Sequence, residues 1–360
     1  MKNKRGREFP SAFAFPCLFS FTNNTNRAIL KGNQSIPLGV LMKRFSALFG
    51  ALLLLLSAGC RPAAVTEEAD VRILASTYPV YLLTCAVTQG VDGVQVERLN
   101  TGSVSCLHDY TLSVTDMRKI DRADILVLSG AGLEDFMDDA LASTSAPVID
   151  CSAKVSLLVS PDHRHDHEHH DHDHGHFDPH YWLDPANASA MVDTLLDGLL
   201  PVLGEQAQQL NTNAETARTL FAVCEAQLQT VRTQNEALPG LISFHDGFGY
   251  LAHACGVSVL RAIEEEAGSE ASARDIMEVS ALVREHNIPI IFTERSGSDA
   301  TAKAIARETG CGIRVLSTLM DGPDADTLSC SPAEYYANEL LTNASVLIGG
   351  LTGREVVFPT

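Results

Sequence analysis

The chain has 360 residues, of which 45% are hydrophobic, and this is enough to build two domains with cores of their own. Its 26 basic and 45 acidic side chains give a formal net charge of −19 at pH 7. Binding to nucleic acid needs clustered basic side chains, so this balance argues against a nucleic-acid partner and suits a protein that attracts cations.

The first segment with a recognisable pattern begins at Met42. A short basic region, Met42-Lys43-Arg44, precedes an apolar stretch over residues 45–56 and the ending Leu56-Ser57-Ala58-Gly59-Cys60. The apolar stretch is too short to span a bilayer but has the length of a signal-peptide core. Its ending resembles a bacterial lipobox, so we expect Cys60 to be acylated and to anchor the protein in the membrane. The alternative is an ordinary cleaved signal that ends near a cysteine.

These features suggest the first domain boundaries. Residues 1–41 do not fit a secretory signal, so we expect Met42 to be the true start and residues 42–59 to be a lipoprotein signal peptide, followed by a tether over 60–70. A chain that starts at Cys60 keeps 18 basic and 44 acidic side chains, which gives a net charge of −26. It also keeps seven further cysteines, an odd number, so at least one thiol stays free whatever disulfides form.

Strand-like and helix-like patterns alternate from Val71 onward. This alternation predicts a parallel sheet with helices on both faces, and we assign residues 71–204 to an N-terminal α/β lobe. A His-rich tract over 162–176 has no periodicity and is expected to be a solvated loop within this lobe. The predicted strands cover 71–77, 94–99, 124–128 and 147–150, and the helices cover 78–89, 113–120, 133–141 and 185–200.

Residues 205–238 contain neither Pro nor Gly and predict one long helix. At 1.5 Å per residue it would extend about 50 Å, so we interpret it as a rigid connector. The alternative is a pair of helices with a break near Asn211. Residues 239–360 then form a C-terminal α/β lobe, and the fold class is two α/β lobes joined by the connector. Its predicted strands cover 241–244, 257–262, 289–293 and 312–316, and its helices cover 247–255, 273–286 and 300–309.

The tract concentrates potential metal ligands, since nine of the 13 histidines lie between positions 163 and 180. Neutral imidazole and carboxylate are suitable ligands for zinc and related cations. We expect a low-affinity metal loop here, the alternative being a solvated spacer without a role. Its histidines are His163, His165, His167, His169, His170, His172, His174 and His176.

Further metal-competent side chains lie near the ends of predicted strands. His245 and Glu294 each follow a strand directly, and ligands of open α/β sheets bind outside the carboxyl ends of strands. Taken singly, each histidine is more readily explained as a hydrogen-bonded structural residue. Together they can converge on one site. The segments concerned are Cys106-Leu107-His108-Asp109-Tyr110, Asp178-Pro179-His180-Tyr181-Trp182-Leu183-Asp184-Pro185, Ser243-Phe244-His245-Asp246 and Ile290-Ile291-Phe292-Thr293-Glu294.

These segments resemble the zinc and manganese solute-binding proteins of ABC transporters. The likeness extends from Val71 to about Ile348, with the histidine motifs in the order and spacing of that family. It implies two lobes bridged by a long helix, with one metal ion between them. It also implies that His108, His180 and His245 are three of the metal ligands.

The resemblance leaves the fourth ligand open. Some family members use a glutamate at a strand end, which would be Glu294. Others use an aspartate in the loop after the next strand, where Thr318 stands in this chain and Asp321 follows. We therefore predict Glu294, with Asp321 in reserve. Three imidazoles with one carboxylate form a tetrahedral set that suits Zn²⁺, whereas Mn²⁺ prefers more oxygen ligands.

The resemblance implies an extracytoplasmic lipoprotein, held on the outer face of the cytoplasmic membrane. It would capture zinc as a monomer for the permease of a high-affinity ABC importer, without catalysing a reaction. The alternatives are a manganese- or iron-binding member, a surface adhesin with a structural metal, and a zinc hydrolase. A hydrolase needs an open coordination position and a general base, and the sequence contains no HExxH motif.

Overall fold

The computed structural model describes residues 70–99, 107, 110–159, 177–235, 238–264, 272–295 and 299–358. The chain divides into two units, residues 1–66 and 67–360, and all described residues belong to the second. Cys60 and the tract over 162–176 therefore lie outside the described residues. Among the described helices, none combines the length and the apolar composition needed to cross a membrane.

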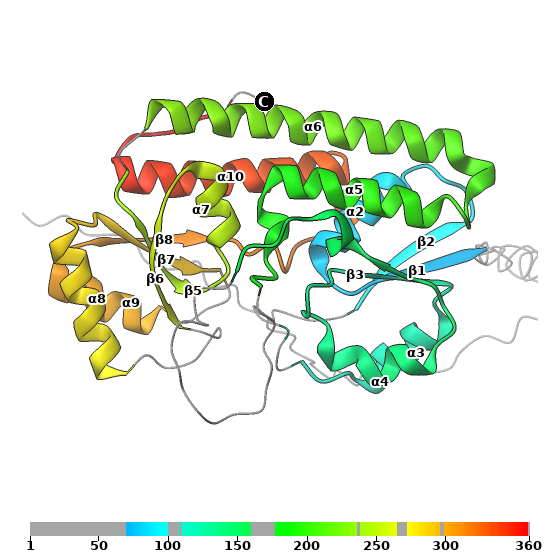
Figure 1. Cartoon of the computed structure of the whole chain (residues 1–360), viewed down its shortest axis with the longest axis horizontal. Coiled ribbons are helices and arrows are strands. Elements are labelled where there is room, and N and C mark those ends of the chain that lie inside the picture. The colour runs from blue at the N-terminus through cyan, green and yellow to red at the C-terminus, as the bar shows by residue number, and fades with distance from the viewer. Residues whose placement is uncertain are drawn as a thin grey trace, which may run out of the picture. The chain divides into compact units, whose positions relative to one another are not determined.

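The first lobe is built on a four-stranded parallel sheet with the order β2-β1-β3-β4. The apolar run of β3 is buried at every residue, as expected for a strand that is covered on both faces. Helices α2 and α5 cover one face and α3 and α4 the other (Figure 1). The elements are β1 (Val71–Ala75), α2 (Tyr78–Val87), β2 (Val94–Arg98), α3 (Val114–Arg122), β3 (Ile125–Leu128), α4 (Asp138–Ser143), β4 (Val148–Asp150) and α5 (Pro185–Leu199).

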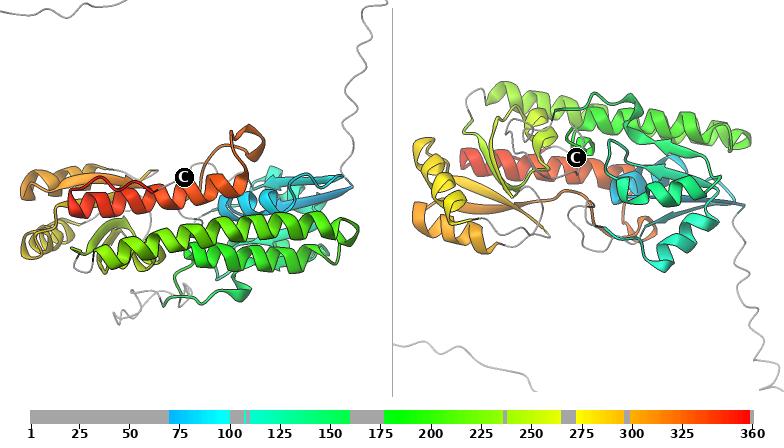
Figure 2. Two further views of the ribbon diagram at one scale, coloured as in Figure 1. Left: turned by 90° about the horizontal axis from the view of Figure 1, so that it is seen from above. Right: turned by 60° about the horizontal axis from the view of Figure 1, so that its bottom comes forward.

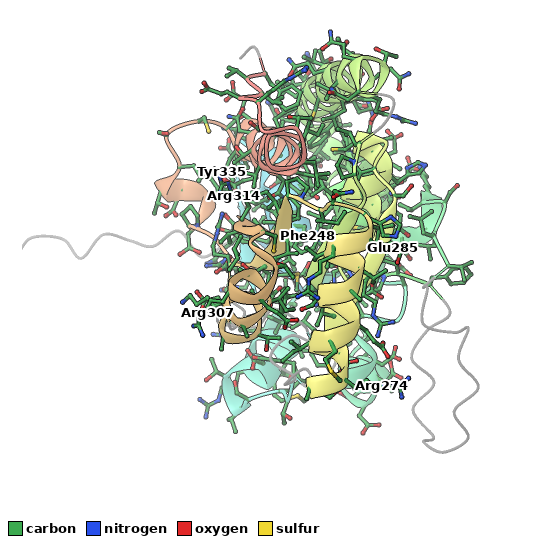
Figure 3. The ribbon with its side chains drawn as sticks, turned by 90° about the vertical axis from the view of Figure 1, so that its left-hand side faces the viewer. Phe248, Arg274, Glu285, Arg307, Arg314 and Tyr335 are labelled. Carbon is green, nitrogen blue, oxygen red and sulfur yellow. The ribbon has the colours of Figure 1, made fainter. Side chains whose placement is uncertain are left out.

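The second lobe repeats this topology with the order β6-β5-β7-β8, again all parallel. Helices α8 and α9 cover its outer face, and their labelled side chains Arg274, Glu285 and Arg307 lie at the surface (Figure 3). The same strand order thus arises twice without a convincing internal sequence repeat. The elements are β5 (Leu241–His245), α7 (Gly249–Cys255), β6 (Val259–Glu264), α8 (Ala273–Glu285), β7 (Ile290–Glu294), α9 (Ala300–Thr309) and β8 (Gly312–Leu316).

Helix α6 (Ala207–Gln234) runs between the two lobes as one continuous helix, so the alternative of a break near Asn211 is wrong. Its 28 residues extend about 42 Å. A second helix, α10 (Pro332–Thr352), is absent from the sequence-based prediction. It packs against α2 of the first lobe and against α6, α7 and β8, and it lies alongside α6 (Figure 2). The predicted fold class is confirmed, with α10 as an additional bridge.

One large hydrophobic core extends through both lobes on the side of α6 and α10. It includes Trp182 of the first lobe, Phe221 of α6, Phe248 of the second lobe and Tyr336 of α10, all at most 1% exposed. Protein interiors are packed as densely as organic crystals and resist deformation. The shared core therefore holds the facing ends of the two sheets in a defined arrangement.

Candidate metal centre

His180 lies in a short, tightly held segment before α5. The side chain of Asp184 caps this helix by accepting from the backbone N–H of Ala186 at 2.8 Å, and Pro185 occupies the first helical position. Between His180 and Asp184 the chain forms a single 3-10 turn over Tyr181–Leu183, whose side chains are fully buried. The Asp-Pro pair and the buried turn thus fix the backbone on which His180 is placed.

Trp182 connects this segment to the second lobe. Its indole N–H donates to the carbonyl oxygen of Thr318 at 2.8 Å, and its own carbonyl oxygen accepts from the hydroxyl of Tyr336 at 2.9 Å. The rings of His180 and Trp182 contact each other, with centroids 5.2 Å apart. His180 therefore lies beside the loop that follows β8.

His245 ends β5 and meets His180 across the lobes. The two Nε2 atoms are 3.1 Å apart, the rings are nearly perpendicular at 88°, and the residues are only 4% and 2% exposed. Tetrahedral zinc with Zn–N bonds of 2.0–2.1 Å separates two nitrogen ligands by about 3.4 Å. The two nitrogens are thus already close to the spacing that a shared zinc ion requires.

Asp178 orients the imidazole of His180. Its Oδ1 atom accepts from the ring Nδ1–H at 2.8 Å and from the backbone N–H of His180 at 2.9 Å. With the ring proton on Nδ1, neutral His180 presents the Nε2 lone pair toward His245. This role of Asp178 was not predicted from the sequence. The overlooked signal is the Asp-x-His spacing, which lets one carboxylate reach both the ring and the backbone of the histidine.

Glu294 ends β7, the strand next to β5, and is 4% exposed. Ser243 pairs with Phe292 in the parallel register, so two residues further along His245 and Glu294 end neighbouring strands at the same level. Side chains at equivalent positions of paired strands lie on the same face of a sheet. Glu294 is therefore placed on the same sheet edge and face as His245.

Asp321, the reserve candidate, lies in a different environment. Its side chain is 38% exposed, and its carboxylate is 3.8 Å from the guanidinium of Arg295. The residue of this loop that lies next to Trp182 is Thr318, which is 5% exposed and has no carboxylate.

His108 and the eight tract histidines lie outside the described residues. Leu107, just before His108, is fully buried, and the hydroxyl of Tyr110, just after it, donates to Asp116 at 2.9 Å. Among the described residues, no group of three or more His, Cys, Asp or Glu side chains is spaced to hold a metal ion. The described part of the centre is the pair His180 and His245 with Glu294 on the adjacent strand.

Three of the cysteines in the described region are not suited to metal binding. Cys85, Cys151, Cys224, Cys255, Cys311 and Cys330 are free thiols. Burial raises the pKa of Cys85, Cys224 and Cys255 to about 12. The thiolate is the form that binds metals, so these three side chains remain protonated at neutral pH and do not compete with imidazole.

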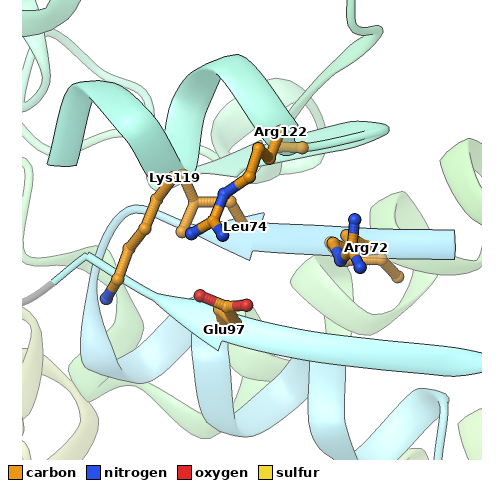
Figure 4. A pocket seen from close by; sticks show the side chains of 7 residues that line it. Arg72, Leu74, Glu97, Lys119 and Arg122 are labelled. Carbon is orange, nitrogen blue, oxygen red and sulfur yellow. The ribbon is translucent and has the colours of Figure 1, made fainter. Parts of the chain in front are cut away.

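A shallow pocket elsewhere in the first lobe has the wrong charge for a cation. It lies between α3 and strands β1 and β2 and is lined by Arg72, Lys119 and Arg122 around a single carboxylate, Glu97 (Figure 4). Three positive charges against one negative charge repel a metal ion. The candidate centre is therefore the histidine pair rather than this pocket.

Comparison with known proteins agrees with the histidine motifs. The sequence profile of the family described as "Zinc-uptake complex component A periplasmic" matches residues 73–347. The chain belongs to this family. The resemblance inferred from the motifs around His108, His180 and His245 is thereby confirmed at the level of the family.

The curated relatives of this chain are distant from it in sequence. The chain is 28% identical over 276 residues to the zinc-binding protein AdcA of Streptococcus pyogenes serotype M3, a match that covers 71% of this chain and 52% of AdcA. It thus spans about half the length of that relative. It is 27% identical over 290 residues to the high-affinity zinc uptake system protein ZnuA of Bacillus subtilis, covering 78% and 90% of the two chains.

The fold is shared with the periplasmic zinc-binding protein TroA of Treponema pallidum. The two structures superpose with a TM-score of 0.62 at 21% identity, over 78% of this chain and 99% of TroA. This likeness supports the two-lobed architecture and extends over nearly the whole of TroA.

Proposed function

We propose that this protein captures zinc outside the cytoplasm and delivers it to the membrane permease of an ABC importer. The observation that carries the proposal is the 3.1 Å separation of the Nε2 atoms of His180 and His245, two buried imidazoles from different lobes. Their spacing, the orientation of His180 by Asp178, and membership of the zinc-uptake component A family all support zinc as the cargo.

The proposed ligand set is His108, His180, His245 and Glu294. Three neutral nitrogens and one carboxylate are a common closed, tetrahedral environment for Zn²⁺. Manganese and iron(II) prefer sites with additional oxygen ligands. The reserve carboxylate Asp321, which could supply such oxygens, is turned toward Arg295. The same set would fill all four positions, which favours binding and release of an ion over hydrolysis by a metal-bound water.

We further propose that Cys60 carries the lipid anchor and that the His-rich tract over 162–176 binds additional zinc weakly. A lipid-anchored protein with a net charge of −26 would concentrate cations near the membrane surface. Transfer to a permease then needs only diffusion in two dimensions.

The test is the metal content and affinity of the whole chain. Purified without added metal, it should contain one tightly held zinc ion per chain by elemental analysis once weak sites are stripped with a mild chelator. A strain that lacks the gene should grow normally in rich medium and poorly in zinc-depleted medium, with rescue by added zinc. Tight binding of manganese in preference to zinc would contradict the proposal.

A further inference from the structure

Tyr250 contacts the segment around the metal centre from the other lobe, and neither the ligand set nor the family comparison gives it a role. It lies in α7, five residues after His245, and is 2% exposed. Burial raises the pKa of its phenol to about 12, so the hydroxyl is protonated at physiological pH and can both donate and accept.

The hydroxyl of Tyr250 closes a ring of three hydrogen bonds. It donates to the carbonyl oxygen of Asp178 at 3.0 Å and accepts from the backbone N–H of Leu158 at 2.7 Å. The third bond joins the backbone N–H of Asp178 to the carbonyl oxygen of Leu158 at 2.9 Å. Val159 and Phe177 continue this contact as an antiparallel bridge.

This ring of hydrogen bonds adjoins His180, a proposed metal ligand of the first lobe. Asp178, one of its three members, holds His180 through two hydrogen bonds that a single carboxylate oxygen accepts. The start of α7 packs against the same carboxylate, since a Cβ atom added to Gly249 would lie 2.8 Å from Oδ2 of Asp178. Tyr250 and Gly249 thus place the Asp178 backbone and side chain relative to the second lobe.

We propose that Tyr250 is a positioning residue of the metal centre: it fixes Asp178, and through Asp178 the imidazole of His180, against the lobe that carries His245. The inference rests on the proposed zinc site. His180 and His245 come from different lobes, so they reach the spacing that zinc requires only if the two lobes are held in a fixed relative position near these residues. One phenol bonded to both backbone segments at 158 and 178 supplies that constraint next to the site itself.

The experiment compares Tyr250→Phe with wild type in the whole chain. The substitution keeps the buried ring and removes the hydroxyl. Zinc affinity is measured by chelator competition at fixed pH, and the ligand-field absorption spectrum of the Co²⁺-loaded protein reports the coordination geometry. We expect zinc affinity to fall about 10-fold, at the lower end of the effect of groups that orient metal-binding histidines. The cobalt spectrum should change as well.

Tyr81→Phe is the matched control. Tyr81 is also buried at the contact between the lobes, where its hydroxyl accepts from the backbone N–H of Ala325 at 3.1 Å. It contacts neither His180 nor Asp178 through that hydroxyl, so affinity and cobalt spectrum should stay at the wild-type values. An equal loss in both variants would overturn the proposal, because it would reveal a general loosening of the lobes.

A double-mutant cycle tests the route through Asp178. If Tyr250 acts on His180 by way of Asp178, then Tyr250→Phe should have little further effect on affinity in an Asp178→Ala background. A full additional loss in that background would overturn the proposed route, and so would wild-type affinity and spectrum in the single variant. Absence of a tight zinc site in the wild-type protein would instead refute the proposed function.

Discussion

The imidazole of His180 and the imidazole of His245 meet at 3.1 Å between Nε2 atoms, although 65 residues separate them in the chain. Both imidazoles are held in place by neighbouring parts of the structure. His180 is fixed by Asp178, and His245 ends a fully buried strand. A site whose ligands are held before the metal arrives does not have to order them on binding, which favours tight capture of a small ion.

Gly247 provides a direct test of this close approach. A Cβ atom at this position would lie 2.5 Å from Cδ2 of His245 and 3.1 Å from Cδ2 of His180, so Gly247→Ala must displace at least one imidazole. Misplaced ligands bind less well, and we expect zinc affinity to fall by about 100-fold or more, beyond the effect of losing one outer hydrogen bond. Gly204→Ala is the control, because a Cβ atom there meets nothing within 4 Å. Equal affinities of the two variants would show that the rings are not in the described positions.

The buried carboxyl of Glu134 should make the folding stability of the metal-free protein depend on pH. Burial raises the pKa of this carboxyl to about 7, even though it accepts hydrogen bonds from Ser76, Ser129 and Gly130 at the ends of β1 and β3. Because the folded-state pKa lies above the unfolded-state value, ionisation of Glu134 opposes folding. The stabilisation of the folded state by protonated Glu134 is fully present below about pH 4.5 and is lost as the pH rises through about 7. The free energy of unfolding changes by up to about 3 kcal/mol over this range.

The measurement is the free energy of unfolding at pH 5 and pH 8 in the presence of a chelator. Wild type should lose more stability over this range than Glu134→Gln, which has no proton to lose. The exposed Glu285→Gln serves as the control and should follow wild type. If Glu134→Gln and wild type show the same pH dependence, Glu134 does not titrate in this range.

The described ends of the His-rich tract allow a clean deletion. Val159 and Phe177 form an antiparallel bridge, so residues 160–176 can be replaced by Asn-Gly, which closes such a pair as a two-residue turn. We expect calorimetry to show that the weak zinc sites disappear while one tight site remains. A variant with the eight tract histidines changed to asparagine keeps the length of the tract and should behave in the same way. Loss of the tight site in both variants would mean that the primary ligands lie in the tract.

Strands such as β3 and β5 were predictable because their mostly apolar runs are short, bounded by turn residues and buried at every position. All eight strands lie within two residues of their predicted positions at either end. The long connector followed from the absence of Pro and Gly. These are local features of the sequence, and the motif resemblance added which strand ends carry the proposed ligands.

Helix α10 and the role of Asp178 were missed for different reasons. The buried residues of α10 follow a helical period, but Asn343 interrupts its apolar face. That side chain is buried because it bonds to both the backbone N–H and the carbonyl oxygen of Ser317. The contact of Asp178 with His180 depends on a rotamer, and the ring closed by Tyr250 depends on packing between lobes. The Asp-x-His spacing permits the first contact without specifying it, and no spacing in one sequence indicates the second.

Substitution of Cys60, which lies outside the described residues, tests the proposed lipid anchor. Two acyl chains hold a protein stably on a membrane, whereas a protein without them is free to leave it. We therefore expect Cys60→Ala to be released from the membrane fraction or to accumulate as an unprocessed precursor. Cys330→Ala, a change at a partly exposed thiol of the folded body, should stay in the membrane fraction. Intact-mass data that show an unmodified Cys60 in native membranes would contradict the anchor.

Two carboxylates are candidates for the fourth metal ligand, and we predict Glu294 rather than Asp321. Glu294 is buried at the end of β7, level with His245 on the neighbouring strand, so the sheet holds it in place. Asp321 is partly exposed and 3.8 Å from Arg295, and exposed ion pairs of this kind contribute about 0–1 kcal/mol to stability. Removing Asp321 should therefore change little, whereas removing a carboxylate ligand leaves an open position that water must fill.

Zinc affinity of Glu294→Ala and Asp321→Ala should be compared in the background in which Asn-Gly replaces residues 160–176. The pH must be fixed, because histidine binds metal only in its neutral form. We expect Glu294→Ala to weaken binding by more than the ~10- to 100-fold typical of groups that only orient a ligand, and Asp321→Ala to match the parent protein. Glu339→Ala is the control for the shared partner, since Glu339 also pairs with Arg295, at 3.3 Å. If Asp321→Ala loses the tight site while Glu294→Ala and Glu339→Ala keep it, the loop after β8 supplies the ligand and the assignment to Glu294 is wrong.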